Sequence, residues 1–141
     1  MTEDTHRQVT IERITNSHYA VTNARGGTIT VGTADSADFS PVELLLTAIG
    51  ACTAIDVDIL TSRRAEPDSF AIAVDAEKLR DEKGRSYLTD IAVTFRIRFP
   101  EGEDGDKART LLPDAVKRSR EQLCTVSRTV ELGTPVATRI E

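Results

Sequence analysis

The sequence predicts an α+β fold with the element order βββ-α-ββ-α-β and a largely antiparallel sheet. Three observations carry this prediction. Segments that alternate between apolar and polar residues, typical of half-buried strands, come in two runs, before residue 32 and over residues 69–99. One long apolar segment, residues 40–64, separates the runs and opens with a helix start signal. Because strands follow strands along the chain, an antiparallel sheet is favoured over a doubly wound parallel one.

The first three strands are expected to form a β-meander within residues 1–32. Residues 8–14 alternate, and residues 18–22 and 28–31 follow after turn-forming residues. The segment Asn-Ala-Arg-Gly-Gly, residues 23–27, has the flexible residues that a hairpin needs.

The apolar segment 40–64 predicts a long, buried central helix. Ser40 suits the N-cap position, Pro41 the first helical position, and Glu43 completes a capping box with Ser40. Apolar residues follow nearly all round this helix, and such a helix is buried on several sides. Its small residues would let a second subunit approach closely; these are Ala48, Gly50, Ala51 and Ala54. We therefore expect a homodimer.

The second half of the chain predicts a hairpin, a helix and a last strand. Residues 69–79 and 87–99 alternate around a glycine-containing turn, so they form a long antiparallel hairpin with one buried face. Residues 106–123 have an amphipathic helical pattern that Pro113 either kinks or restarts. A short helix over residues 125–132 is expected to end at Gly133, and residues 136–140 are expected to return as a strand within the segment 106–141.

Length and charge restrict the class of protein. A chain of 141 residues is expected to form one domain, residues 1–141, with a core of its own. A net charge of -5 argues against nucleic acid or an anionic membrane as a partner. The first residues lack the apolar stretch of a secretory signal, and the central apolar run, interrupted by Asp56 and Asp58, is expected to be too short for a bilayer. These observations predict a cytoplasmic protein.

The two cysteines, Cys52 and Cys124, are the candidates for chemistry. In a reducing compartment they are either unrelated core residues or a redox pair. Burial raises the pKa of a thiol, so a reactive Cys52 needs a nearby cation, and Asp56, one turn further along the helix, would oppose ionisation. The candidate cations near the N-terminus are Arg7, Arg13 and Arg25. His6 and His18 have no spacing that suggests a metal site.

Two segments of the sequence resemble one known family. FSPVELLLTAIGACTAIDV, residues 39–57, and REQLCTVSRTVELG, residues 120–133, are similar to the OsmC/Ohr superfamily (osmotically inducible protein C and organic hydroperoxide resistance proteins), and most to its OsmC-like branch. The resemblance covers nearly the whole chain, because the order of elements fits as well.

The resemblance implies both architecture and activity. Proteins of this family are intertwined homodimers with active sites at the dimer interface and need no metal or organic cofactor. The cysteine matching Cys52 attacks an organic hydroperoxide or hydrogen peroxide and becomes a sulfenic acid, and the one matching Cys124 resolves it as a disulfide. A dithiol reductant, in some branches a lipoyl-bearing protein, restores the thiols.

The sequence departs from the family pattern at one position. Characterised peroxidases of the family carry a glutamate ten residues before the first cysteine, and it holds a catalytic arginine over the thiolate; Val42 stands there in this chain. Glu43 is turned about 100° around the helix from that position and has a sufficient role as the capping partner of Ser40. Arg25 resembles a recurrent arginine of the branch and is the candidate catalytic cation, the alternative being a solvated turn residue.

Two hypotheses follow. The first is a thiol-dependent peroxidase with Cys52 as nucleophile, Cys124 as resolving thiol and Asp56 hydrogen-bonded to a donor at the dimer interface. The second is a non-catalytic dimeric protein of the same fold that binds a small apolar ligand at the subunit interface.

Overall fold

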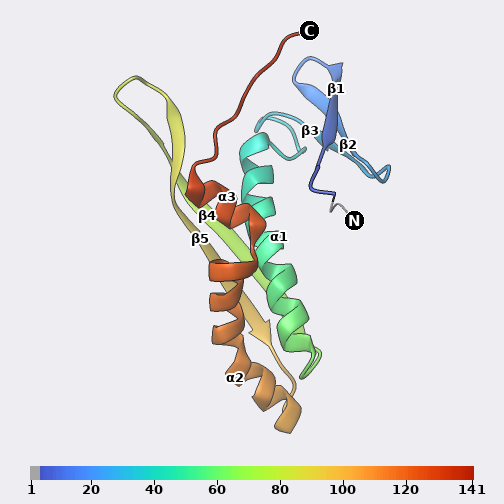
Figure 1. The fold of residues 1–141 in the computed structure, drawn as a ribbon, viewed down its shortest axis with the longest axis vertical. Helices are drawn as coiled ribbons and strands as arrows, with labels where there is room; N and C mark the ends of the chain where they lie inside the picture. Colours follow the sequence, from blue (N-terminus) through green and yellow to red (C-terminus); the bar gives the residue numbers. More distant parts are fainter. Residues whose placement is uncertain (1–3) are drawn as a thin grey trace. The chain divides into compact units, whose positions relative to one another are not determined.

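The computed structural model describes residues 4–141 and divides the chain into two compact units, Met1–Leu45 and Leu46–Glu141. Figure 1 shows the elements in chain order. The first unit holds β1 (Val9–Thr15), β2 (His18–Asn23) and β3 (Thr28–Val31), and α1 (Pro41–Ser62) begins in it. The second holds the rest of α1 and then β4 (Ser69–Arg80), β5 (Ser86–Arg98), α2 (Glu103–Arg118), a π-helical turn η1 (Ser119–Leu123) and α3 (Thr125–Leu132). The α+β class and the antiparallel pairing are confirmed, while a single domain over residues 1–141 stays a prediction.

The N-terminal strands form the expected meander, in the order β1-β2-β3 with both pairs antiparallel. The side chain of Asn23 closes the second turn, because its Oδ1 accepts the N–H groups of Arg25 and Gly27 at 3.0 Å each. Gly26, with φ at 91°, supplies the left-handed residue of that turn. The apolar side chains of Val9 and Ile11 are exposed, so this sheet has an uncovered apolar face in the single chain.

The capping box at the start of α1 is confirmed. The Glu43 N–H donates to Ser40 Oγ at 3.2 Å, and the Ser40 N–H donates to Glu43 Oε1 at 2.9 Å. Hydrogen bonds to the carboxylate, first from the Ser40 backbone N–H and then from the Ser40 side chain, hold the pKa of the Glu43 carboxyl below its usual value. Glu43 is therefore a structural residue, as its spacing predicts.

One face of α1 is buried against the hairpin of the second unit, along Ile49, Thr53, Val57 and Thr61. Gly50 lies on this side, and a Cβ there would stand 2.5 Å from Val74 Cγ2 on β4. The glycine thus permits close packing of α1 on β4 within the chain, rather than the approach of a second subunit that its size suggested.

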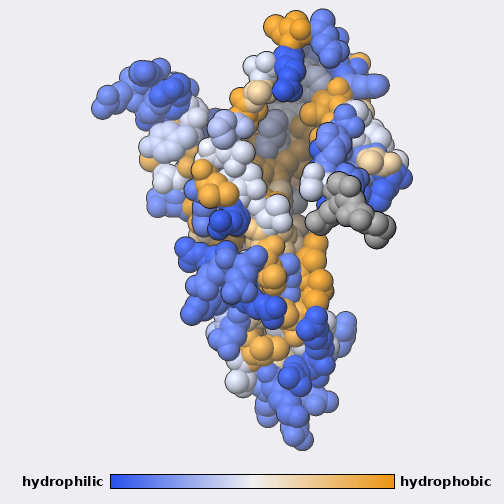
Figure 2. Space-filling model, in the orientation of Figure 1, coloured by the Kyte–Doolittle hydropathy of each residue, from blue (hydrophilic) through white to orange (hydrophobic). Residues whose placement is uncertain are grey.

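The opposite face of α1 is apolar but uncovered. Ile55 is 59% and Ile59 52% exposed, and Figure 2 shows apolar surface beside this helix. At 22 residues and a mean hydropathy of 1.7 over its most apolar stretch, α1 is long and apolar enough to cross a membrane, so the expectation that it is too short was wrong. In the single chain 28% of that stretch is buried, with Gly50 packed on β4.

The hairpin β4–β5 runs from the pair Ser69–Arg98 to the pair Arg80–Ser86, with an irregularity between Asp75 and Glu77. The predicted alternation is confirmed, because inward residues such as Phe95 are half-buried and outward ones such as Arg96 are exposed. This face supplies the sheet side of the site described below.

The C-terminal elements differ from the prediction in two places. α2 begins at Glu103, since Gly102 turns the chain at φ 113° and Gly105 lies against the carbonyl of Pro100. Pro113 lies inside this helix, which continues past it. The predicted strand over residues 136–140 was wrong: this segment is irregular, and Val136 and Ile140 are 90% and 101% exposed. A strand needs a partner edge for its backbone groups, and the segment pairs with no described strand.

Candidate functional site

The two cysteines lie together in the second unit. Cys52 is near the middle of α1 and half-buried, while Cys124 follows η1, caps α3 and is 3% exposed. Both are free thiols, and they lie close enough for each to shift the pKa of the other. Two cysteines distant in sequence are thus neighbours in the fold, and a disulfide between neighbours requires Cα atoms within about 7 Å of each other.

The Cys124 sulfur is surrounded by hydrogen-bonding groups. It accepts the Ser127 N–H at 3.4 Å, pairs with Ser127 Oγ at 3.3 Å, and lies 3.7 Å from the donating Thr53 Oγ1. Burial raises the pKa of this thiol, but the hydrogen bonds from Ser127, Cys52 and Thr53 together lower it below the ordinary value. The N-terminus of α3 therefore favours a thiolate at Cys124.

The pKa of Cys52 shifts in the opposite direction. Burial raises it most, the neighbouring Cys124 and the Asp56 carboxylate raise it further, and a hydrogen bond from the Val126 backbone only partly opposes them. Within residues 4–141 of one chain, no arginine is among the groups that shift it. The cation that a reactive Cys52 needs is thus not supplied by the described surroundings of this thiol.

Asp56 has a partner on the segment that leads to Cys124. Ser119 Oγ donates to Asp56 Oδ2 at 2.7 Å, and Ser119 is fully buried. The hydrogen-bond donor predicted for Asp56 exists, but it comes from the same chain.

The remaining predicted residues lie in the first unit or at its boundary. Val42 is 41% exposed on the first turn of α1. Arg25 is exposed at the β2–β3 turn, Arg13 is exposed on β1, and Arg7 donates to the carbonyls of Asp4 and His6. The catalytic role of Arg25 stays a prediction. In the described part of the chain, no three histidine, cysteine, aspartate or glutamate residues are grouped to hold a metal.

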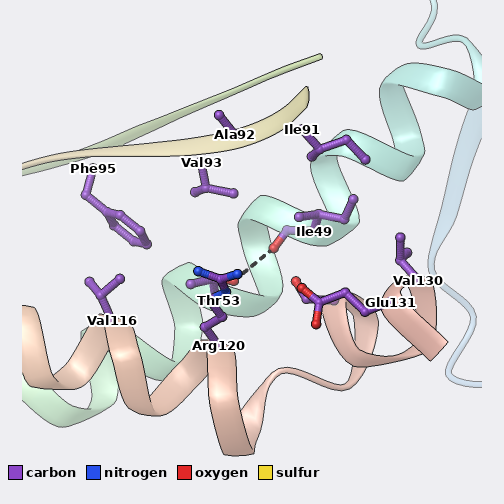
Figure 3. Close-up of a pocket in the computed structure, with 11 residues that line it drawn as sticks. Ile49, Thr53, Ile91, Ala92, Val93, Phe95, Val116, Arg120, Val130 and Glu131 are labelled. Carbon is purple, nitrogen blue, oxygen red and sulfur yellow. Dashed lines mark hydrogen bonds between the residues drawn. The ribbon is translucent and has the colours of Figure 1, made fainter. Parts of the chain in front are cut away.

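A pocket of about 460 Å³ lies in the second unit, lined by neighbours of the Cys124 sulfur and by neither cysteine. Thr53 and Ser127, which both hydrogen-bond to the Cys124 sulfur, line it. Figure 3 shows side chains of α1, β5, α2 and α3 converging on this space, with Arg120 and Glu131 as its charged groups. Its apolar lining consists of Ile49, Ile91, Ala92, Val93, Phe95, Val116 and Val130.

Sequence reasoning missed Thr53, Ser119, Ser127 and Arg120. One signal was available, because a serine three residues after Cys124 has the spacing at which a helix N-cap meets its N–H donor. Nothing in the local sequence marks Ser119 as the partner of Asp56, since that contact depends on how α2 packs on α1.

Comparisons with known proteins identify the family of the chain. A family model described as OsmC-like protein matches residues 32–139. An uncharacterized protein of Mycobacterium tuberculosis is 30% identical over 131 residues, which are 92% of each chain.

Solved structures share the fold. A hypothetical protein from Aquifex aeolicus has a TM-score of 0.69 at 29% identity, covering 92% of this chain and 89% of the other. An OsmC-like protein of unknown function from Vibrio cholerae has a TM-score of 0.73 at 14% identity, covering 93% and 95%. The organic hydroperoxide resistance protein OhrB of Bacillus subtilis has a TM-score of 0.56 at 17% identity, covering 89% and 90%.

Proposed function

The chain belongs to the OsmC-like family, and from its paired thiols we propose that it is a thiol-dependent peroxidase of organic hydroperoxides. The observation that carries the proposal is that the Cys52 and Cys124 thiols are neighbours, because a sulfenic acid formed on one has the other thiol close by. The likeness of fold to an organic hydroperoxide resistance protein agrees with this class of reaction.

In the proposed reaction the Cys52 thiolate attacks one peroxide oxygen, the O–O bond breaks, and the alcohol leaves with a proton. The Cys124 thiolate then attacks the sulfur of the Cys52 sulfenic acid, the hydroxyl leaves as water, and a disulfide forms. An external dithiol reduces the disulfide, and no metal or organic cofactor takes part. In characterised branches of the family the reductant is a lipoyl-bearing protein, which is the reductant we propose to test first.

Access and acidity favour different thiols as the nucleophile. Cys52 is half-buried and Cys124 almost fully buried, which favours attack by Cys52. The pKa directions favour a thiolate at Cys124, so Cys52 requires a cation beyond its described neighbours, and Arg25 of either subunit is the candidate. Serine variants of the two cysteines show whether Cys52 or Cys124 is the nucleophile.

The pocket beside the thiols supports an organic substrate. An apolar lining gains from taking up the alkyl part of a hydroperoxide, whereas hydrogen peroxide has no apolar surface to bury. Faster reaction with cumene hydroperoxide than with hydrogen peroxide is the expected preference.

Stopped-flow oxidation of the reduced protein, followed by mass spectrometry, tests the proposal. We expect a second-order rate well above that of a free small thiol, a disulfide between the two cysteines, and no turnover in Cys52→Ser. Cys124→Ser should retain one oxidation and accumulate a sulfenic acid on Cys52. A rate equal to that of a free thiol would refute the peroxidase, and a sulfenic acid trapped on Cys124 in Cys52→Ser would reverse the two roles.

We also propose a cytoplasmic homodimer. Ile55 and Ile59 on α1, like Val9 and Ile11 on β1, leave apolar surface uncovered that a second copy would bury. Sedimentation at several concentrations checks this, with a monomer at micromolar concentration as the contrary result.

A second candidate function rests on the pocket alone. The chain would be a binding protein for a small apolar ligand, with inert cysteines, because the family's arginine-holding glutamate is replaced by Val42. Unchanged thiols after peroxide treatment, together with chemical-shift changes at Phe95 and Val116 on addition of a medium-chain alcohol, would favour this function.

A further inference from the structure

One buried residue, Ser119, connects the segments that carry the two thiols. Its Oγ donates to Asp56 Oδ2 at 2.7 Å, and Asp56 is one helical turn beyond Cys52 on α1. Its carbonyl accepts the N–H of Cys124 at 2.8 Å. A single fully buried serine is thus bonded by its side chain to the Cys52 helix and by its backbone to Cys124 itself.

The Ser119 side chain differs from other buried hydroxyls of the chain. Thr53 and Thr61 each donate to the carbonyl four residues earlier in their own helix, which is the usual solution for a hydroxyl within a helix, and Thr53 also reaches the Cys124 sulfur at 3.7 Å. Ser119 donates instead to a carboxylate on another helix, and a hydrogen bond to an ionised group is roughly twice as strong as a neutral one.

The backbone at Ser119 is also unusual. The helix widens into the π-helical turn η1, so the Cys124 N–H reaches back five residues to the Ser119 carbonyl. Single π-helical turns within helices occur frequently at functional sites. Here the widened turn lies immediately before Cys124, whose thiol is a neighbour of the Cys52 thiol.

We propose that Asp56 and Ser119 form a positioning clamp, which fixes the η1 turn on α1 and so holds the Cys124 sulfur against Cys52 for disulfide formation. This inference rests on the proposed redox pair. Neither residue contacts the substrate; both act through the position of Cys124. The clamp raises the effective concentration of one thiol at the other, because the two sulfurs are held together before reaction.

The Asp56 carboxylate also acts on the Cys52 pKa through its charge, and this effect can be tested separately from its hydrogen bond to Ser119. It contributes to the raised pKa of Cys52, so removing its charge favours the Cys52 thiolate. Asp56→Asn removes the charge and keeps an oxygen that accepts from Ser119, whereas Asp56→Ala and Ser119→Ala both break the hydrogen bond.

The experiment measures the disulfide equilibrium of the full-length protein against glutathione. One oxidised glutathione converts the two thiols into a disulfide and leaves as two reduced glutathiones, and the disulfide fraction after acid quenching gives the effective concentration of the pair. We expect Ser119→Ala and Asp56→Ala to lower that concentration at least tenfold, the double variant to lower it no further, and Asp56→Asn to stay within threefold of the wild type. Thiol titration should also show a lower Cys52 pKa in Asp56→Asn than in the wild type.

Thr61→Ala is the matched control. Thr61 is equally buried on α1, but its hydroxyl bonds within its own helix and has no contact with the thiols, so the variant loses stability without loss of disulfide. Each variant is assayed only if circular dichroism shows that it is folded. Because Ser119→Ala and Asp56→Ala break the same hydrogen bond, one folded variant of the two is enough for the test.

The outcomes separate the clamp from the proposed function. An unchanged effective concentration in folded Ser119→Ala and Asp56→Ala, or an equal loss in Thr61→Ala, would overturn the clamp alone. A wild-type disulfide without peroxidase turnover would overturn the proposed function alone. A wild-type protein that forms no disulfide at any glutathione ratio would overturn both.

Discussion

Gly50 is the most sharply defined packing constraint on the helix that carries Cys52. A Cβ at this position would lie 2.5 Å from Val74 Cγ2 and 3.1 Å from Ile72 Cδ1, whereas carbon atoms are in favourable contact near ~3.5–4.0 Å. Val74 would have to retreat by about 1 Å, and it is a β-branched residue held in the hairpin opposite Val93.

Gly50→Ala sets two effects against each other. Alanine in a helix interior gains about 1 kcal/mol over glycine, while overpacking a buried contact costs about 1–3 kcal/mol. The atoms that the new Cβ would meet belong to the branched side chains of Val74 and Ile72 on a paired strand, so we expect the upper part of that range and a net loss of about 1–2 kcal/mol in the free energy of unfolding.

Chemical denaturation at one protein concentration measures the effect, in a cycle with Val74→Ala. Removing both γ-methyl groups of Val74 relieves the contact, so Gly50→Ala in the Val74→Ala background should regain about 1 kcal/mol or more. Ala51→Gly, at an exposed position on the same helix, controls for helix propensity and should cost about 1 kcal/mol. If Gly50→Ala raised stability by the same amount in both backgrounds, the close packing of α1 on β4 would be refuted.

Four further predictions concern the thiols, the start of α1 and Arg25. Ultraviolet titration of thiolates should give two steps, the first below the ordinary thiol pKa and lost in Cys124→Ser, the second above it and lost in Cys52→Ser; a single step at the ordinary value would contradict the site. Because the folded pKa of Cys124 is lowered, its contribution to stability should be lost as pH falls through that pKa, which denaturation of Cys124→Ser and wild type at several pH values measures. Ser40→Ala should cost about 1 kcal/mol of unfolding free energy by removing the cap bonded to Glu43, and no change would mean that the capping box is not needed. Arg25→Ala should slow peroxide oxidation of Cys52 and raise its pKa if Arg25 is the missing cation, while Arg25→Lys should retain part of the rate; equal rates in all three proteins would leave Arg25 as a turn residue.

The sequence predicted the elements well because their signals are local. The capping box at Ser40, the alternation around Phe95 and the end of α3 at Gly133, with φ at 64°, each depend on a few neighbouring residues. The prediction of a strand over residues 136–140 was wrong. The alternation of apolar and polar residues indicates which side chains a strand would bury, but it does not show that a neighbouring strand is available for pairing.

Only part of the site could be predicted by the same reasoning. The two cysteines stood out as residue types, and the resemblance paired them before their contact was seen. The acidity of each thiol could not be read from the sequence, since it depends on Ser127 at one sulfur and on burial with Asp56 at the other. The bond from Ser119 to Asp56 joins helices distant in the chain and has no sequence periodicity to mark it.

The uncovered face of α1 has a thermodynamic consequence. Whatever buries Ile55 and Ile59 binds the folded chain and not the unfolded one, so it adds to stability by mass action. If a second copy of the chain buries this face, the melting temperature rises with protein concentration, and dilution both dissociates the dimer and lowers the stability of the fold. The helix that carries Cys52 would then be least stable in dilute solution, and redox measurements on this protein depend on the concentration at which they are made.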